Sequence, residues 1–138
     1  MKNLIIAVFI CMLFIECNTS EYSANDLTRR MLINKNWELS IVTVDGITRN
    51  IYSGLVLNFR SSEYTSLNGL KIFPASGTWK FLGDDGKRIL RDDGLEITIE
   101  SISEGQLEIS FYWQNSTFIG GRGSELAGLN KLIFRRRL

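Results

Sequence analysis

Apolar and polar residues alternate along most of the chain after Trp37, which is the pattern of β-strands that are buried on one face. The alternation is clearest in "LEITIE" (residues 95–100) and "LEISFYW" (residues 107–113), where every second residue is leucine, isoleucine, phenylalanine or tryptophan. A short turn at residues 103–105 lies between these segments. They therefore predict an antiparallel β-hairpin.

Three earlier segments show the same alternation, and each is predicted to turn one row of side chains inward. The rows are Trp37, Leu39 and Ile41; Leu55, Leu57 and Phe59; and Gly77, Trp79 and Phe81. Asp-Gly pairs at 45–46, 85–86 and 93–94 are typical of tight turns, and a last strand is expected at about residues 129–135.

The connections between these strands indicate the fold class. No predicted helix is long enough to cross over between parallel strands, so neighbouring strands must be joined by hairpins. The sequence therefore predicts an all-β domain, an antiparallel up-and-down meander of about seven or eight strands that forms a barrel or a strongly curled sheet. A two-sheet sandwich is the competing arrangement.

One short N-terminal helix is expected before the strands. Asn25 or Asp26 is predicted to cap it, and it should end near Ile33. Leu27 and Met31, four residues apart, would share its apolar face.

The first residues have the pattern of an export signal. Lys2 precedes an apolar run at residues 4–15, and a helix of about 12 residues, about 18 Å long, is too short for a hydrocarbon core of about 30 Å. Cys17 follows this run directly and a polar stretch follows Cys17, which resembles a bacterial lipoprotein signal. Leu13 fits the start of that motif, whereas Glu16 stands where a small residue is usual.

We therefore expect Cys17 to be lipidated and to anchor the protein to a membrane. The predicted organisation is a lipoprotein-type signal peptide at 1–16, a polar tether at 17–26 and a β domain at 27–138. Cleavage at another position, with Cys17 as a spare thiol, and an uncleaved signal anchor are the alternatives.

Composition restricts the chemistry that this domain can perform. With 138 residues, 44% of them hydrophobic, the chain suits one globular domain, and a formal net charge of +1 argues against nucleic acid as a partner. The chain has no histidine, the commonest general base near neutral pH and the commonest metal ligand. Cys11 would leave with the signal peptide, so no cysteine remains within the β domain for catalysis.

The acidic residues give no catalytic or metal site. Glu96, Glu100 and Glu108 lie on neighbouring predicted strands, but the alternation places them on the solvated face. The acidic pairs at 84–85 and 92–93 lack the ligand spacing of a calcium loop and are interpreted as turns. We therefore expect a non-enzymatic protein with no catalytic residue, no cofactor and no metal.

Several segments together resemble a known family. They are "NWELSIVTVDG" (36–46), "SGTWKF" (76–81), the "DDG" turn before "LEITIE" and "GGRGSELAGLNKLIF" (120–134), which are similar to the lipocalin-like domains of small lipoproteins of Bacteroidetes. The resemblance implies a barrel whose floor is closed by Trp37, with a terminal arginine stacked on it. It also implies a place in the bacterial cell envelope, as an outer membrane lipoprotein that faces the periplasm or the cell surface.

The resemblance implies a fold more than a ligand. Lys35 stands two residues before the tryptophan, where lipocalins proper have glycine, and their aspartate-tyrosine loop signature is not evident. An eight-stranded barrel is either filled by side chains or holds one small ligand, and large inward side chains favour a filled interior. The candidate ligand-binding residues of this interior are Trp37, Phe59, Trp79, Phe81, Phe111 and Trp113.

Two functions are compatible with these observations. The first is an envelope-anchored, non-enzymatic binding module that holds a small hydrophobic ligand. The alternative is a structural or protein-interaction domain of the envelope with a filled core and no ligand. The expected partners are the membrane, through Cys17, and either a small hydrophobic molecule or an envelope protein, but no nucleic acid.

Overall fold

The structure is a computed structural model that describes residues 21–69, 71–114 and 126–138. Within these ranges a helix, α2 (Ala24–Leu32), precedes a nine-stranded sheet. The strands are β1 (Asn36–Val44), β2 (Ile47–Thr48), β3 (Val56–Phe59), β4 (Glu63–Leu67), β5 (Ser76–Phe81), β6 (Arg88–Arg91), β7 (Glu96–Ile102), β8 (Gln106–Trp113) and β9 (Gly128–Arg137).

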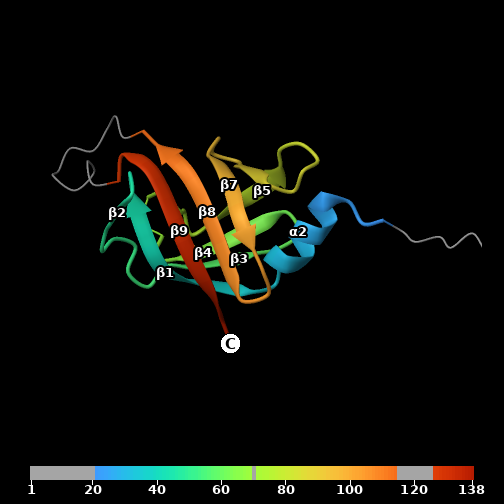
Figure 1. Cartoon of the computed structure of the whole chain (residues 1–138), viewed down its shortest axis with the longest axis horizontal. Coiled ribbons are helices and arrows are strands. Elements are labelled where there is room, and N and C mark those ends of the chain that lie inside the picture. The colour runs from blue at the N-terminus through green and yellow to red at the C-terminus, as the bar shows by residue number, and fades with distance from the viewer. Residues whose placement is uncertain (1–20, 70, 115–125) are drawn as a thin grey trace, which may run out of the picture.

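The sheet closes on itself. From β3 to β9 each strand pairs antiparallel with the next one in the chain, and β1 pairs with both β3 and β9 (Figure 1). Eight strands therefore form a closed barrel, and β2 is an extra strand that pairs with the end of β1. The predicted antiparallel meander with one short helix is confirmed, and its closure distinguishes a barrel from a curled sheet or a sandwich.

The closing pair extends along the whole of β1. Its residues lie opposite residues 130–137 of β9, and hydrogen bonds fasten its end. The Asp45 amide donates to the Leu129 carbonyl, and the Leu129 amide donates to the Asp45 carboxylate, both at 2.9 Å. Gly128 makes this approach possible, because a Cβ at its position would lie 2.3 Å from a carboxylate oxygen of Asp45.

A β-bulge in β1 changes which residues face inward. Trp37 is fully buried as predicted, but the register shifts between Leu39 and Ile41, and Ile41 is 45% exposed. Val42 and Val44 are buried instead. The prediction that Ile41 faces the core is therefore wrong, because one extra residue in a bulged strand reverses the alternation beyond it.

The helix starts earlier than its predicted cap. Ser23 is the N-cap, since its hydroxyl accepts a 3.1 Å hydrogen bond from the Asp26 amide. Asn25 has another role: its side-chain oxygen accepts from the Gly86 amide at 2.8 Å, and its amide donates to the Gly83 carbonyl at 3.0 Å. The prediction of Asn25 or Asp26 as the cap is wrong, because Asn25 fastens α2 to the β5–β6 turn.

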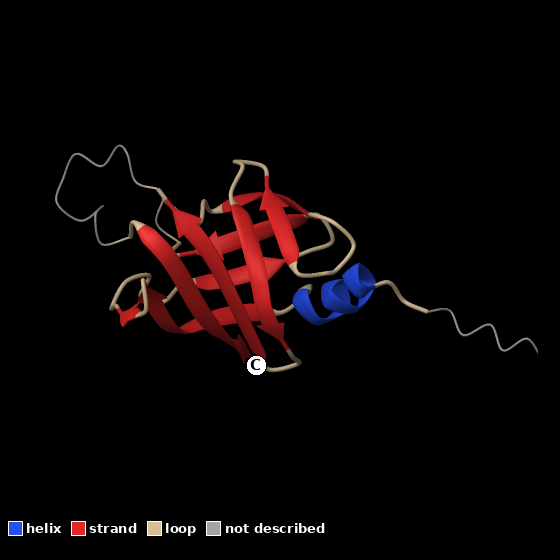
Figure 2. Ribbon diagram, turned by 45° about the horizontal axis from the view of Figure 1, so that its top comes forward, coloured by secondary structure: helices blue, strands red, loops and turns tan. Residues whose placement is uncertain are grey.

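The helix also buries a different face from the one predicted. Leu27 is 48% exposed and Met31 is half-buried, whereas Thr28 and Leu32 are buried. Figure 2 shows α2 lying against one end of the barrel. The approach is close because Gly86 has no side chain: a Cβ there would lie 2.6 Å from the Thr28 hydroxyl.

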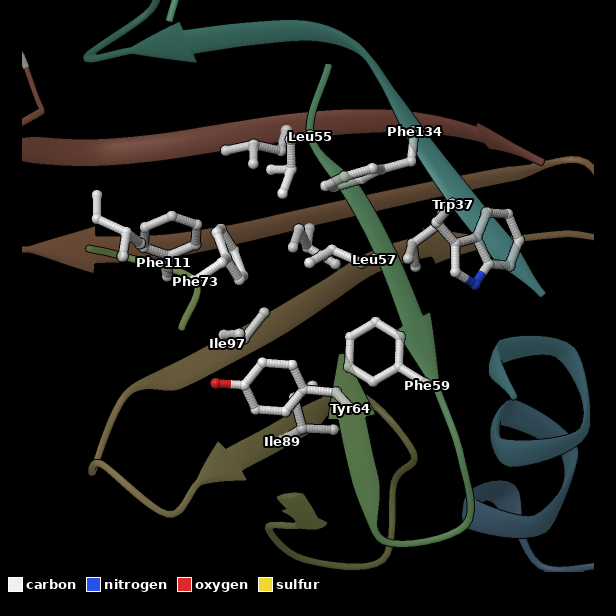
Figure 3. Packing of buried hydrophobic residues seen from close by; sticks show 14 of the residues in the cluster. Trp37, Leu55, Leu57, Phe59, Tyr64, Phe73, Ile89, Ile97, Phe111 and Phe134 are labelled. Atoms are coloured by element: carbon white, nitrogen blue, oxygen red, sulfur yellow. The ribbon is translucent and has the colours of Figure 1, made fainter. Parts of the chain in front are cut away.

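The remaining strands follow the predicted alternation closely. Leu55, Leu57 and Phe59 are buried, and so are Ile97 and Ile99 of β7. Together with residues of the other strands they form one apolar core inside the barrel (Figure 3). The hydrophobic effect therefore acts inward from every strand of the wall.

We predict that threonine is tolerated at position 41 and not at position 42. Val42→Thr places a hydroxyl in the core and should lower the free energy of unfolding by about 1–3 kcal/mol. Ile41→Thr, on the exposed side of the bulge, should change it by about 0.5 kcal/mol or less. Urea unfolding at pH 7 measures both, and a larger loss for Ile41→Thr would contradict the observed bulge.

Candidate functional site

The six candidate interior residues divide into two groups. Trp37, Phe59, Trp79 and Phe111 are buried, whereas Phe81 and Trp113 are half-buried. Trp79 lies 5.8 Å from Phe59 and 5.2 Å from Phe81, between ring centroids, and Trp37 adjoins α2. Phe111 contacts Phe73 instead, at 5.6 Å, and Trp113 follows it along β8. Trp37, Phe59, Trp79 and Phe81 therefore lie in the half of the barrel next to α2, and Phe111 and Trp113 lie in the far half. Figure 3 shows Trp37 and Phe59 on the side of α2 and Phe111 beside Phe73 on the other side.

The indole groups of the α2 half have all their hydrogen bonds. The Trp37 N–H donates to the Leu32 carbonyl at 2.9 Å. The Trp79 N–H donates to the carbonyls of Arg60 and Glu63, at 3.0 and 3.1 Å. Backbone carbonyls of the protein therefore pair both indole N–H groups in this half of the interior.

Cations cover the aromatic rings at this end. The Arg29 guanidinium of α2 lies 5.3 Å from the Trp79 ring and 5.2 Å from the Phe81 ring. In the described part of the chain, the cation over Trp37 is Lys35, at 5.8 Å. The expected stacking of a terminal arginine on Trp37 is therefore wrong: Arg136 lies opposite Trp37 in the register of β1 and β9, but its guanidinium pairs with Glu104 at 3.8 Å.

The far half is organised around Phe73. Its ring centroid lies 6.4 Å from that of Tyr52 and 5.6 Å from that of Phe111, both in edge-to-face geometry. Tyr52 and Phe73 belong to the loops before β3 and β5, and both are 2% exposed. Sequence reasoning missed them because loop residues carry no alternation that would mark an inward side chain.

Polar atoms without hydrogen bonds gather in this half. Among the described residues, the buried side-chain atoms without a partner are Tyr52 Oη, Tyr64 Oη, Trp113 Nε1 and Asn130 Oδ1. Each such atom typically costs about 1–3 kcal/mol relative to a paired one. These four atoms therefore lower the stability of the fold relative to a core in which they were paired.

Topology places these atoms around the same rings. Asn130 of β9 lies directly opposite Phe111 of β8, and Trp113 lies two residues beyond Phe111 on the same face of that strand. Tyr52 joins them through Phe73. In Figure 3 the Tyr64 hydroxyl points away from α2.

The orientation of Asn130 is fixed by its amide. The nitrogen donates to the carbonyls of Leu126 and Gly128, at 2.8 and 3.1 Å. Its oxygen is consequently left as an acceptor, and the residue is fully buried. No other feature of "GLNKLIF" marks this asparagine except that it interrupts the apolar row of β9.

Tyr52 is held in a conformation that an aromatic residue rarely adopts. Its φ of +58° lies in the left-handed region. Burial raises the pKa of its hydroxyl far above the ordinary value, so the group stays neutral. Burial also raises the pKa of Tyr64, with the charges of Asp93 and Asp92 adding to the rise and Arg91 opposing it. Both hydroxyls can therefore donate as well as accept.

The barrel wall is interrupted beside Tyr52. β1 pairs with β3 only at residues 36–38, and beyond the bulge it turns to β2. A surface depression of about 260 Å³ follows this gap, lined by residues 39–42 and 48–54. The loop that carries Tyr52 therefore lines the depression where β1 and β3 separate.

Arg91 is a buried cation with a partner. The residue is 2% exposed, and its guanidinium holds both carboxylate oxygens of Asp93 in a forked ion pair, through Nε at 3.0 Å and through Nη2. Nη1 donates to the Ile72 carbonyl at 2.6 Å, which fixes the loop that carries Phe73. The guanidinium also lies 5.4 Å from the Tyr64 ring. Its charge is thus neutralised within the fold.

Carboxylates of the outer face lie as predicted. Glu96 and Glu100 are exposed, Glu108 pairs with Lys131 at 2.5 Å, and Glu100 accepts a 2.5 Å hydrogen bond from Ser110.

In the ranges that the structure describes, no group of three or more cysteine and acidic side chains could hold a metal ion. No helix within those ranges has the length and apolar character needed to cross a membrane. Cys17 and the signal segment lie outside the described residues.

Comparisons with known proteins give no assignment: no protein-family model matches the chain, and no curated protein matches it. The candidate site therefore stands on its geometry: in the described residues, Tyr52, Trp113 and Asn130 bring unpaired polar atoms to the end of the interior away from α2.

We predict that Asp93→Asn destabilises the protein by about 3 kcal/mol at pH 7, because Arg91 is left buried without a counter-charge. This is the lower end of the range for breaking a buried pair, since the Asp93 side chain is 40% exposed. Asp92→Asn removes the same charge at an exposed position and should have little effect. Urea unfolding compares the two variants.

The same pair should make stability depend on pH. Burial alone would raise the pKa of Asp93, but the hydrogen bond and charge of Arg91 outweigh it and hold the pKa below its usual 3.8. The stabilisation is therefore present above that value and lost as pH falls through the lower folded-state pKa. We expect the unfolding free energy of Asp93→Asn to fall less than that of the wild type below about pH 4. Parallel curves would contradict this assignment.

Proposed function

We propose that the domain is a non-enzymatic binding module that holds a small, mostly hydrophobic ligand in the half of the barrel away from α2. The observation that carries this proposal is the set of unpaired buried atoms around Phe73 and Phe111. Tyr52, Phe73 and Phe111 are at most 3% exposed, so these side chains would have to move apart to admit a ligand. The ligand would then be enclosed by apolar rings and oriented by a few polar groups, which is the usual composition of small-molecule sites.

The contrast between the two halves supports this location. Both indole N–H groups of the α2 half are satisfied, by Leu32, Arg60 and Glu63. Of the six candidate residues, Phe111 and Trp113 therefore belong to the proposed site. Trp37, Phe59, Trp79 and Phe81 would form its closed floor.

We also propose that the module is a lipocalin-like lipoprotein of the bacterial cell envelope, anchored through Cys17 at the outer membrane. The short separation between anchor and fold supports a close attachment, because α2 begins at Ala24. Residues 18–23 would be the whole tether, shorter than the predicted segment that ends at residue 26. The domain would face either the periplasm or the cell surface.

A second candidate function has its own observations. A structural or interaction domain is favoured by the dense core and by exposed apolar side chains on the outer face, namely Ile41, Ile47, Tyr112 and Leu129. Closure of the barrel counts against recruitment of a partner strand, since it leaves little open edge beyond the short β2.

We predict that the full chain, purified in a mild detergent and incubated with an envelope lipid extract, carries a small molecule detectable by native mass spectrometry. Trp113→Glu should abolish this added mass, because a carboxylate would enter the proposed site. Tyr112→Glu is the matched control. Tyr112 is the neighbour of Trp113 in the chain, but its side chain is 61% exposed and points outward, so the added mass should persist in this variant.

A bare protein mass in the wild type would contradict the binding module and favour the interaction domain. Equal loss of the mass in both variants, with folding intact by circular dichroism, would place the ligand outside the far half.

For the anchor, we predict that Cys17→Ser moves the protein from the membrane fraction to the soluble fraction and abolishes incorporation of labelled fatty acid. Cys11→Ser is the control and should leave both unchanged, because residue 11 lies within the segment predicted to be removed. Labelling that survives Cys17→Ser would refute lipidation at this position.

A further inference from the structure

We propose that a groove on the outer wall of the barrel binds a sugar ring that carries a carboxylate group. The groove lies outside the barrel interior, so this inference goes beyond the proposed function and does not depend on it. It rests on a polar row and an apolar pair of side chains that line the same depression.

The polar row crosses four neighbouring strands at one level. Asn36 of β1 lies directly opposite Arg137 of β9 on one side and Asn58 of β3 on the other. Thr65 of β4 in turn lies opposite Asn58. Side chains of directly opposite residues share a face of the sheet, with their Cβ atoms about 5 Å apart. Trp37, which follows Asn36, is buried in the interior, so the row faces outward.

A depression of about 290 Å³ lies over this row, and all four polar residues line it. Val56 and Leu67 line it as well, directly opposite each other on β3 and β4 and two residues away from the polar row. Leu67 is 60% exposed, so a ligand can reach this apolar pair. Small-molecule sites begin at about 300 Å³, so the depression suits a single ring better than a long chain.

Hydrogen bonds within the row determine which of its atoms are free. The Asn58 amide nitrogen donates to the Lys35 carbonyl at 3.1 Å and to Asn36 Oδ1 at 3.0 Å. Asn58 Oδ1 is left to accept and Asn36 Nδ2 is left to donate, and within the described residues neither atom has a partner. The Thr65 hydroxyl is free in the same sense, whereas that of Ser66, the remaining lining residue, donates to backbone carbonyls. The groove therefore offers donors and acceptors at neighbouring positions, and each hydroxyl of a sugar both donates and accepts.

Arg137 gives the groove its charge. Its side chain is exposed and has no ion pair within the described part of the chain, whereas Arg136 pairs with Glu104 at 3.8 Å. The described residues that line the groove include no aspartate or glutamate. A guanidinium donates parallel hydrogen bonds that fit the two oxygens of a carboxylate. The anionic group of a ligand is therefore expected at the β9 end of the row.

An acidic sugar matches all of these features at once. Its hydroxyls pair with the two asparagines and the threonine, its apolar C–H face lies on Val56 and Leu67, and its carboxylate pairs with Arg137. A carboxylic acid without hydroxyls would leave the amide groups unused. A neutral sugar would leave the guanidinium unused.

The test compares three probes that share a six-membered ring: methyl β-glucuronide, methyl β-glucoside and cyclohexanecarboxylate. The glucoside lacks the carboxylate, and cyclohexanecarboxylate lacks the hydroxyls. Each is titrated at pH 7 and low salt into the full chain in dodecylphosphocholine micelles, and the side-chain amide NMR signals of Asn36 and Asn58 report binding. We expect the glucuronide to bind at least about fivefold more tightly than either of the others, because it alone engages both the guanidinium and the amides.

Variants at exposed positions test the individual contacts. Arg137→Gln should weaken glucuronide binding about fivefold and leave glucoside binding unchanged, since only the carboxylate loses a contact. Arg135→Gln is the matched control: it removes the same charge from the same face of β9, but Arg135 does not line the groove, so binding should equal that of the wild type. Thr65→Val, which removes a hydroxyl and keeps the shape, should weaken both sugars about threefold and leave cyclohexanecarboxylate unaffected.

Equal binding of the glucuronide and the glucoside would overturn the role of Arg137. Equal binding of the glucuronide and cyclohexanecarboxylate would overturn recognition of the hydroxyls, and binding of none of the probes would overturn the site. Equal weakening by Arg137→Gln and Arg135→Gln would show a general attraction of charge and would also overturn the inference. None of these results bears on a ligand of the interior, which the comparison of Trp113→Glu with Tyr112→Glu tests separately.

Discussion

The pairing of β1 with β9 is the constraint on which the rest of the structure depends. It joins the first and last strands of the barrel, so every strand of the wall has neighbours on both sides and one face toward a common interior. A bulge divides β1: on the edge away from β9, the first half of β1 pairs with β3 and the second half pairs with β2. The loop of Tyr52 lies at the gap left between β1 and β3 and lines the depression there.

The two ends of the closed interior differ in how well their polar atoms are paired. At one end α2 and the strand ends supply carbonyls for the indole groups of Trp37 and Trp79. At the other end Tyr52 Oη, Trp113 Nε1 and Asn130 Oδ1 have no hydrogen-bond partner. Buried polar atoms without hydrogen bonds oppose folding, so this asymmetry lowers the stability of the unliganded barrel. Binding of the proposed ligand would raise the free energy of unfolding again, so the far half would be more rigid with the ligand bound than without it.

The sequence predicted what depends on local periodicity. The alternation in β3, β5, β7 and β8 identified the strands, their inward rows and the hairpin between β7 and β8. It failed at Ile41, where a bulge reversed the faces, and at the helix, where contact with Gly86 selected Thr28 over Leu27. Phe73 and the pair of Arg91 with Asp93 could not be foreseen, because their positions come from contacts between strands and loops that are distant in sequence or lack a pattern.

The attachment of α2 has a mechanical consequence. The chain enters the fold through this helix, whose contacts with the barrel include two hydrogen bonds of Asn25 and the docking of Thr28 against Gly86. Tension on the N-terminal chain would load these contacts before it reached the closed sheet. Unwinding the nine residues of α2 would lengthen the connection by about 2 Å per residue, roughly 18 Å in all, with the barrel intact. The helix would then act as an extensible spacer, letting the barrel move away from a surface without unfolding.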